Sequence, residues 1–222
     1  MRVKLAIFDY DNTLVDTTKS FYESFISSLI FYGLEPISYD RFLHFFTSNN
    51  LDQHLPQYID REEFWETFLR TYELASYTPK PSPKVFSILS ELRVRGIKLA
   101  IITGRKQSIG RFIEELKRAS LAKYFDYIYT TLDFRESYFT FSKVNAIKHV
   151  LMQAKVNARQ AIMVGDYQSD IISARKAGVI PIGLVDHMPK DGLCRAGAIY
   201  VINKLEDLLV LLNDPLPFRC RK

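Results

Sequence analysis

The chain has 222 residues, of which 47% are hydrophobic, so it can bury a sizeable core and fits one domain with an insertion. No apolar run reaches the roughly 18 residues that span a bilayer, so we expect no membrane segment and no membrane partner. The net charge of +5 is uneven: residues 15–80 hold 10 acidic and 5 basic residues, giving −5, while the remainder holds 15 and 25, giving +10. Because the acidic segment would repel a long polyanion lying across the whole molecule, no nucleic-acid partner is expected.

The cysteines and the N-terminus indicate a location. Cys194 and Cys220 lie in neither a CxxC pair nor a histidine-rich setting. We interpret them as incidental thiols in a reducing compartment. The N-terminus runs straight into an apolar stretch without the layout of a signal peptide. The expected location is therefore the cytoplasm.

The first predicted element is a buried strand. Val3–Phe8 is almost entirely apolar, as expected of a strand covered on both faces of a parallel sheet. Two carboxylates, Asp9 and Asp11, follow it, with Thr13 behind them. Because residues two apart on a strand point the same way, these carboxylates can converge at the carboxyl end, where open α/β sheets bind ligands. Two like charges this close require a neutralising cation or a retained proton.

Residues 15–80 are predicted to form a small helical insert. They hold 15 of the 30 aromatic residues, and apolar side chains recur at helical spacing throughout. Tyr39–Phe46 is expected to be a short helix, and Asp60 with Glu63 has the spacing of a capping box at the start of a later one. Trp65 and most of the aromatic residues are interpreted as the core of a helix bundle.

A proline-rich linker, Thr78–Pro83, closes the insert, and strands and helices alternate after it. Ser82 is expected to cap a helix that begins at Pro83 and ends at Gly96. We then expect strands at Ile97–Ile102, Tyr127–Thr130, Ala161–Val164, Val179–Val185 and Ala198–Ile202. Helices are expected at Lys106–Arg118, Lys143–Ala154, Ser169–Ala177 and Leu205–Leu212. This alternation predicts an α/β fold, a Rossmann-like three-layer core with a mostly parallel sheet, plus the helical insert. The tail Asp214–Lys222 is expected to be loosely held.

Three further polar clusters end predicted strands or begin helices. Thr103 and Gly104 follow one apolar strand, and the glycine lets backbone N–H groups approach a ligand. Lys143 is expected at the first position of a helix, with Ser142 as its N-cap. Asp166 and Asp170 lie on the loop and first turn after another apolar strand. All four clusters lie at one edge of one sheet, and hard oxygen ligands of this type suit Mg²⁺.

In their order and spacing these residues resemble the four motifs of the haloacid dehalogenase superfamily. The motifs are Asp9-Tyr-Asp-Asn-Thr13, Thr103-Gly104, Lys143, and Gly165-Asp166 with Asp170. The insert after the first motif resembles the helical cap of the first type in phosphoglycolate-phosphatase-like members. The resemblance implies a catalytic core of residues 1–14 and 81–222, with a cap of residues 15–80. One departure is Lys143-Val, where the family often has Lys-Pro.

The resemblance also implies a role for each residue. Asp9 would be the nucleophile, and Asp11 the general acid–base, with its backbone carbonyl as a metal ligand. Thr103 and the N–H group of Gly104 would hold the phosphoryl oxygens. Lys143 would neutralise charge there and steady Asp9. Asp9, Asp11, Asp166 and Asp170 would form the Mg²⁺ site, Asp170 either binding the ion or orienting its ligands.

Several alternatives stay open. Asp170 could be a helix N-terminal acid, Thr103 a turn residue, and Lys148 a rival to Lys143. Arg105 either contacts substrate or merely flanks the site. The expected enzyme is a Mg²⁺-dependent phosphatase acting on a small phosphorylated metabolite. The alternatives are a phosphomutase on a sugar phosphate and a non-catalytic binding module that keeps the fold.

Substrate specificity and oligomeric state, monomer or homodimer, cannot be determined from the sequence. Candidate specificity residues that could face the site are Thr17, Thr18, Asp52, His54 and Lys80. Phosphoglycolate, pyrophosphate, a sugar phosphate and a nucleotide all remain possible substrates.

Overall fold

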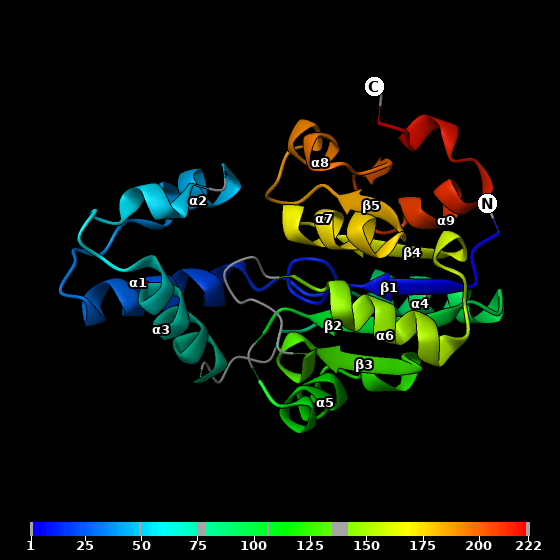
Figure 1. Ribbon diagram of the computed structural model, residues 1–222, viewed down its shortest axis with the longest axis horizontal. Helices are drawn as coiled ribbons and strands as arrows, with labels where there is room; N and C mark the ends of the chain where they lie inside the picture. The colour runs from blue at the N-terminus through cyan, green and yellow to red at the C-terminus, as the bar shows by residue number, and fades with distance from the viewer. Residues whose placement is uncertain (1, 49, 75–78, 106, 135–141, 221–222) are drawn as a thin grey trace. The chain divides into compact units, whose positions relative to one another are not determined.

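Strand β1 (Leu5–Phe8) lies at the centre of a six-stranded sheet with the order β3-β2-β1-β4-β5-β6 (Figure 1). The computed structural model describes residues 2–48, 50–74, 79–105, 107–134 and 142–220. All five strand pairings are parallel, which confirms the predicted α/β fold. The other strands are β2 (Lys98–Thr103), β3 (Tyr127–Thr130), β4 (Ala161–Gly165), β5 (Ile180–Leu184) and β6 (Tyr200–Ile202).

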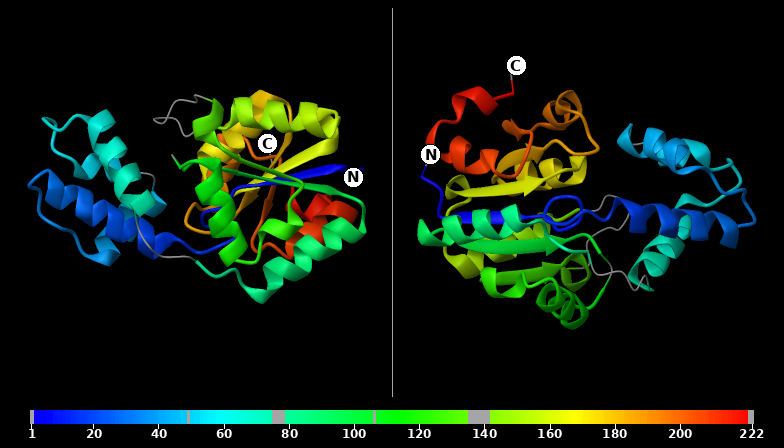
Figure 2. Two further views of the ribbon diagram at one scale, coloured as in Figure 1. Left: turned by 90° about the horizontal axis from the view of Figure 1, so that it is seen from below. Right: turned by 180° about the vertical axis from the view of Figure 1, so that it is seen from behind.

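Helices cover both faces of the sheet, as the two rotated views show (Figure 2). The alternation of side chains along β1 divides the apolar core into two parts. Ala6 and Phe8 belong to the cluster that α4, α5 and α9 complete, whereas Leu5 and Ile7 belong to the cluster completed by α6 and α7. The helices of this part are α4 (Pro83–Val94), α5 (Ile109–Arg118), α6 (Val144–Ala154), α7 (Gln168–Ala177), α8 (Lys190–Ala196) and α9 (Asp207–Asn213).

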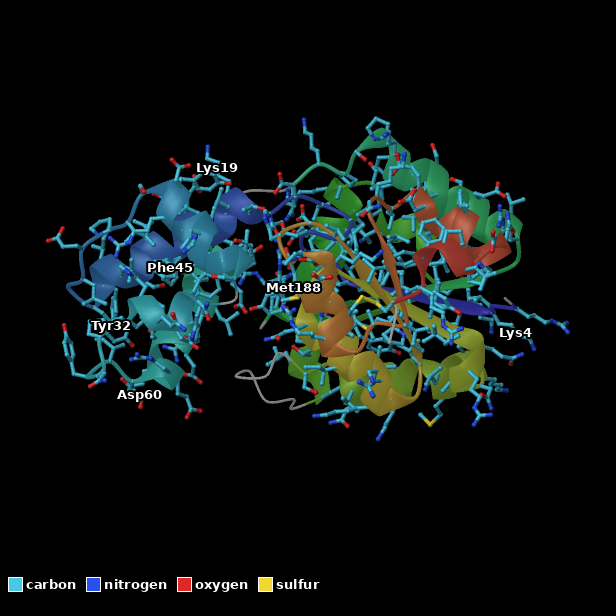
Figure 3. All side chains as sticks on the ribbon, turned by 90° about the horizontal axis from the view of Figure 1, so that it is seen from above. Lys4, Lys19, Tyr32, Phe45, Asp60 and Met188 are labelled. Atoms are coloured by element: carbon cyan, nitrogen blue, oxygen red, sulfur yellow. A yellow bond between two sulfur atoms is a disulfide. The ribbon has the colours of Figure 1, made fainter. Side chains whose placement is uncertain are left out.

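The parallel register brings the strand ends together at one edge. Phe8, the last residue of β1, lies beside Ile101 of β2 and Val164 of β4. Lys4, just before β1, and Met188, beyond β5, mark opposite ends of the sheet (Figure 3). The segments that follow β1, β2 and β4 therefore emerge side by side at the carboxyl edge.

The helical segment forms a compact unit of its own, Thr17–Tyr77, apart from the unit of Met1–Asp16 and Thr78–Lys222. It contains α1 (Thr18–Phe31), α2 (Tyr39–Thr47), α3 (Arg61–Leu74) and the short 3-10 helix η1 (Leu51–His54). Asp60 accepts a hydrogen bond from the N–H group of Glu63 at 3.0 Å, as the predicted cap requires.

Aromatic rings fill the interior of this helical unit. Phe25, Phe42, Phe64 and Phe68 are fully or almost fully buried, which confirms a helix-bundle core, whereas Trp65 is half-buried and Phe31 and Tyr58 are exposed. The ring of Phe21 lies 4.4 Å from that of Phe68 and 4.9 Å from that of Phe46, centroid to centroid, so α1 contacts both other helices through aromatic side chains.

Several predicted boundaries were wrong by a few residues. The helix expected from Lys106 begins at Ile109, because the Ser108 side chain caps it; Lys106 itself lies outside the described residues. The N-cap of α6 is Lys143, not Ser142, so Lys143 lies just before the helix and not at its first position. Ser82 is the N-cap of α4, as expected, but its side chain makes no capping hydrogen bond.

The C-terminal region differs most from the expectation. Helix α8 was not predicted, since it has only seven residues and one of them is Gly192. The tail was wrongly expected to be loosely held: it forms the 3-10 helix η6 (Leu216–Phe218), and the N–H group of Cys220 donates to Ile199 O at 3.0 Å. Residues 221 and 222 lie outside the described part.

The two cysteines are joined in a disulfide, so the prediction of incidental thiols was wrong. Cys194 on α8 and Cys220 in the tail are 26 residues apart, and packing of the tail beside β6 brings their Cα atoms to 5.8 Å. The spacing of the two residues in the sequence carries no sign of this contact. The cysteines therefore no longer support the expectation of a reducing compartment.

Within the described residues, every helix is too short or too polar to cross a membrane.

Candidate active site

The turn after β1 directs the first group of side chains. Asn12 has a φ of 56°, in the left-handed region that asparagine tolerates better than most residues. The N–H group of Asn12 donates to Val15 O at 2.7 Å, and that of Leu14 donates to Tyr10 O at 3.0 Å. These bonds close a tight turn that keeps Asp9, Asp11 and Thr13 at the carboxyl edge of the sheet.

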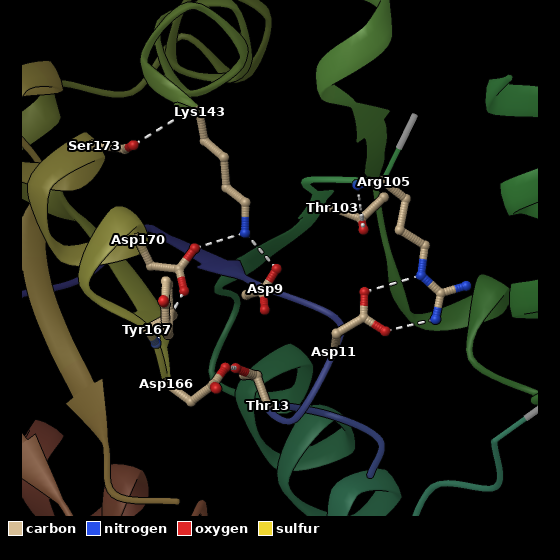
Figure 4. A network of polar contacts seen from close by, with 10 residues as sticks. All are labelled: Asp9, Asp11, Thr13, Thr103, Arg105, Lys143, Asp166, Tyr167, Asp170 and Ser173. Atoms are coloured by element: carbon tan, nitrogen blue, oxygen red, sulfur yellow. Dashed lines mark hydrogen bonds and ion pairs between the residues drawn. The ribbon is translucent and has the colours of Figure 1, made fainter. Parts of the chain in front are cut away.

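Lys143 connects two of the predicted acids. Its Nζ donates to Asp9 Oδ1 and, at 2.6 Å, to Asp170 Oδ1 (Figure 4). The side chain is 4% exposed, and the backbone N–H group donates to Ser173 Oγ at 3.0 Å, which fixes the start of α6 against α7. The rival Lys148 is exposed. The structure thus brings Lys143, and not Lys148, to Asp9.

The turn between β4 and α7 supplies the other acids. A Cβ atom on Gly165 would lie 2.5 Å from the side chain of Asp170, so only glycine allows that side chain to fold back over the strand end. Asp170 Oδ2 accepts a hydrogen bond from the N–H group of Tyr167 at 3.3 Å. Asp166 Oδ1 accepts one from Thr13 Oγ1 at 2.8 Å. Asp170 is therefore both a helix-capping acid and part of the site.

Asp9, Asp166 and Asp170 form a buried acidic group whose ligand atoms lie within 4.8 Å of one another. Burial raises the pKa of Asp9 to about 7, against the pull of Lys143, and the charges of Asp170 and Asp11 add to the rise. Burial, then Asp9 and Asp170, raises the pKa of Asp166 well above its usual range. Burial disfavours the charged form of Lys143, but Asp170 and Asp9 outweigh it and raise its pKa.

Three carboxyl groups therefore face one ammonium, and the raised pKa values of Asp9 and Asp166 mean that retained protons offset part of the negative charge at this buried site. A divalent cation with hard oxygen ligands would supply the missing positive charge. The chemistry of this donor set fits Mg²⁺.

Asp11 has a different partner. Arg105 Nε donates to Asp11 Oδ2 at 2.9 Å, and Arg105 Nη2 donates to Asp11 Oδ1 at 2.5 Å. Figure 4 shows this pair on the other side of Asp9 from Lys143. Each of the two neighbouring carboxylates thus has a cationic partner of its own, Lys143 for Asp9 and Arg105 for Asp11.

Thr103 and Gly104 lie where expected, at the end of β2. Thr103 is fully buried, and its Oγ1 accepts a hydrogen bond from the N–H group of Arg105 at 3.2 Å. A hydroxyl that accepts in this way still has its own hydrogen to donate. Thr103 is therefore a turn residue, and among the contacts of the described residues its hydroxyl hydrogen is not used.

Sequence reasoning gave no role to Thr13, Glu115 or Ser173, and left Arg105 undecided. The signal for Glu115 was present: it follows Phe112 by three residues and precedes Leu116, so it lies on the buried face of α5. Thr13 and Ser173 carry no comparable signal, because a hydroxyl that orients an acid looks like any other in the sequence.

The candidate specificity residues have partners or positions of their own. Asp52 accepts a hydrogen bond from Trp65 Nε1 at 2.6 Å, and the rings of His54 and Phe45 lie 5.7 Å apart. Thr17 and Thr18 are buried and Lys80 is exposed. Asp52 therefore has a structural role within the helical unit.

Comparison with known proteins decides the family. Residues 6–184 match the model of the haloacid dehalogenase-like hydrolases. The chain belongs to this family. A phosphoglycolate phosphatase from Agrobacterium fabrum is 31% identical over 195 residues, which cover 81% of this chain and 79% of that protein. The pyrophosphatase PpaX from Bacillus pumilus is 25% identical over 218 residues, covering 95% and 97%.

Solved structures of related proteins have the same fold as this haloacid dehalogenase-like hydrolase. A haloacid dehalogenase-like family hydrolase from Streptococcus pneumoniae has a TM-score of 0.76 and 20% identity, covering 95% of this chain and 99% of that one. At this identity the likeness shows the fold alone. The family membership confirms the resemblance and, with relatives named as phosphatases, the expected class of enzyme, a phosphatase of this family.

Proposed function

We propose that this chain is a Mg²⁺-dependent phosphatase that hydrolyses a small phosphorylated metabolite through an aspartyl-phosphate. The observation that carries the proposal is the buried group of Asp9, Asp166 and Asp170, with Lys143 bonded to Asp9 and Asp170. A surplus of buried negative charge is costly unless a cation balances it, so the arrangement favours binding of a divalent ion, and that ion together with Lys143 would attract a phosphate.

Asp9 is the nucleophile in this proposal. Its carboxylate oxygen attacks phosphorus, and the bond from phosphorus to the leaving oxygen breaks. Lys143 favours the ionised form of Asp9, against the effect of burial, and fixes the direction of its carboxylate. Thr103 and the N–H group of Gly104 hold phosphoryl oxygens, a contribution that depends on positioning rather than on covalent chemistry.

Asp11 moves the protons. Its carboxyl group gives a proton to the leaving oxygen, and the resulting carboxylate takes one from the water that attacks the aspartyl-phosphate. The second step releases inorganic phosphate and regenerates Asp9.

Asp9 and Asp166 would hold the ion, with the backbone carbonyl of Asp11. Asp170 is occupied by Lys143 and the Tyr167 N–H group, so we assign it to orienting Lys143 and the metal ligands. When bound, Mg²⁺ neutralises charge on the phosphoryl oxygens.

We assign residues 15–80 as a cap that excludes water from the substrate. The separate helical unit, Thr17–Tyr77, supports this assignment. The relatives named for phosphoglycolate and for pyrophosphate support a small phosphorylated substrate.

The first experiment measures release of inorganic phosphate from p-nitrophenyl phosphate and from a panel of metabolite phosphates, with Mg²⁺ and with EDTA. Asp9→Asn should lower kcat by about 10⁴-fold or more while the chain stays folded, because the amide has the shape but not the nucleophilicity of the carboxylate. Asp191→Asn, at an exposed position on α8, is the matched control and should keep full activity. No EDTA-sensitive turnover by folded wild-type protein on any substrate would contradict the proposal.

The intermediate can be tested separately. Asp11→Asn should accumulate protein phosphorylated on Asp9 when given p-nitrophenyl phosphate, since nitrophenolate leaves without a proton but water still needs a base. Mass spectrometry of the peptide that contains Asp9 should show the added phosphoryl group. Hydroxylamine should remove that group, because it cleaves acyl-phosphates. Isomerised sugar phosphate in place of free phosphate would identify a phosphomutase instead.

A further inference from the structure

Arg105 lies between two carboxylates and uses a different part of its guanidinium for each. Nε and Nη2 face Asp11, whereas Nη1 donates to Glu115 at 3.0 Å from Oε1 and 2.8 Å from Oε2. The Arg105 side chain is 10% exposed and that of Glu115 is 8% exposed. This is a bidentate ion pair with a second, buried carboxylate behind it, a geometry that fixes the guanidinium plane.

Tyr10 holds the other side of this network. Its hydroxyl donates to Glu115 Oε1 at 3.0 Å, and the Arg105 Cζ lies 5.0 Å from the centre of its ring. Phe112 in turn packs edge-on against Tyr10 at 5.2 Å. Burial, and then the charge of Glu115, raises the pKa of the Tyr10 hydroxyl, which therefore stays a donor. Tyr10 and Glu115 thus hold Arg105 without any contribution from Asp11.

This division of contacts matters for a group that must change its bonding during a reaction. Before Asp11 can donate a proton, one of its two oxygens must carry that proton. The bond that this oxygen accepts from Arg105 is then weakened or lost. Because Nη1 stays bonded to Glu115, the guanidinium remains in place while Asp11 transfers the proton, and Asp11 can return to the same position.

We propose that Arg105, fixed by Glu115 and Tyr10, is the positioning residue for the acid–base Asp11. The inference rests on the proposed function. In the first step the Asp9 oxygen bonds to phosphorus, the bond to the leaving oxygen breaks, and the Asp11 proton goes to that oxygen. Arg105 touches none of these atoms; it sets the place from which Asp11 donates.

A positioning role predicts a dependence on the leaving group. An alkoxide leaving group needs the proton of Asp11, whereas nitrophenolate leaves without one. Loss of the position of Asp11 should therefore slow formation of the aspartyl-phosphate, which kcat/KM reports, far more with alkyl phosphates than with p-nitrophenyl phosphate. A purely structural role would lower kcat/KM for both substrates alike.

The test uses the full chain with Mg²⁺ and compares kcat/KM on p-nitrophenyl phosphate with kcat/KM on the best alkyl phosphate of the panel. This quantity covers only the steps up to phosphorylation of Asp9, whereas hydrolysis of the aspartyl-phosphate is common to both substrates and enters kcat. Arg105→Lys, which keeps the charge but loses the fork, should lower kcat/KM on the alkyl phosphate by about 10- to 100-fold. On p-nitrophenyl phosphate kcat/KM should fall by less than about threefold. Glu115→Gln should act in the same direction. Glu114→Gln is the matched control, since Glu114 lies on the same helix, is exposed and bonds only Lys117 among the contacts described.

If Arg105→Lys or Glu115→Gln fails to fold by circular dichroism, Tyr10→Phe removes a single oxygen from the network and gives the same readout. If kcat/KM falls equally on both substrates, or on neither, in folded, active variants, the positioning role is overturned and the proposed phosphatase activity is unaffected. Absence of EDTA-sensitive turnover in the wild-type protein overturns both proposals.

Discussion

Two sides of the candidate site hold carboxylates in different ways. On the first side Lys143 faces Asp9 and Asp170, with Asp166 beside them, so one cation meets three buried acids. On the second side Arg105 pairs with Asp11 and Glu115, and the hydroxyl of Tyr10 supplies a further bond. The first side has more acids than its one cation can balance, and its carboxyl pKa values are raised for that reason and because of burial. The second side satisfies its carboxylates with hydrogen bonds.

Each side is suited to a different task. An undercompensated acidic group attracts a divalent cation, through which a phosphate can then bind, whereas a hydrogen-bonded one fixes geometry. Lys143 and Arg105 are therefore not interchangeable here: a lysine reaches two acids as a point charge, and an arginine holds one carboxylate with a planar fork while a second carboxylate anchors it.

The largest effect should come from removing the cation on the first side. Lys143→Met leaves Asp9 and Asp170 buried without their ammonium, which should lower the free energy of unfolding by about 3–5 kcal/mol at neutral pH. Urea unfolding measures this loss, and Mg²⁺ should restore part of it. Lys148→Met, at an exposed position of α6, is the control and should change the free energy of unfolding by less than about 0.5 kcal/mol. Equal stability of Lys143→Met and wild type without metal would show that the two sides do not differ in charge balance.

The pH dependence of stability should also separate the two sides. The pKa of Asp9 is about 7 in the folded chain and 3.8 as its ordinary value, so the folded state binds more protons between these pH values. Its contribution is fully present below about pH 3.8 and is lost as the pH rises through about 7.

Thermal unfolding with EDTA, measured across this window, should thus show a Tm component that falls with rising pH. Mg²⁺ at about 100 times its Kd should add about 2.7 kcal/mol, most visibly above pH 7. Asp9→Asn is the control, because an amide does not titrate and should flatten the slope. A slope unaltered by this substitution would place the titrating group elsewhere.

A smaller effect is expected from changing Thr13, whose hydroxyl orients Asp166. Thr13→Val removes the hydrogen bond to Asp166 and keeps the shape of the side chain. Apparent Mg²⁺ affinity, read from the metal dependence of turnover, should weaken by about 10-fold, as expected for an outer-shell partner. Thr71→Val removes a hydroxyl that donates to Thr67 O within its own helix, its one bond among the described residues, and should leave the metal dependence unaltered. If both substitutions act alike, the bond from Thr13 has no special part in the site.

Much of the first side could be predicted from the sequence. Apolar runs that end on Asp9, Thr103 and Asp166 mark strand ends, and parallel strands bring such ends to one edge. The alternation of strands and helices predicted the sheet, and the helical spacing of the aromatic residues predicted the bundle. Boundaries were less certain, since capping by Ser108 and Lys143 depends on local turns that several residues could have made.

The second side was largely hidden. Glu115 lies ten residues beyond Arg105, and Asp11 lies 94 residues before it, so only the packing of α5 against the turn after β1 reveals the network. The disulfide between Cys194 and Cys220 was missed for the same reason, because it depends on where the tail passes α8.

Local periodicity and strand geometry are enough to predict the order of elements, the parallel sheet and the residues delivered to its carboxyl edge. Which cation meets which carboxylate, that the two cysteines join, and that Asp11 is held from the side of α5 depend on how distant elements pack. Such pairings are set by side-chain reach across packed elements, a property that no stretch of sequence carries alone.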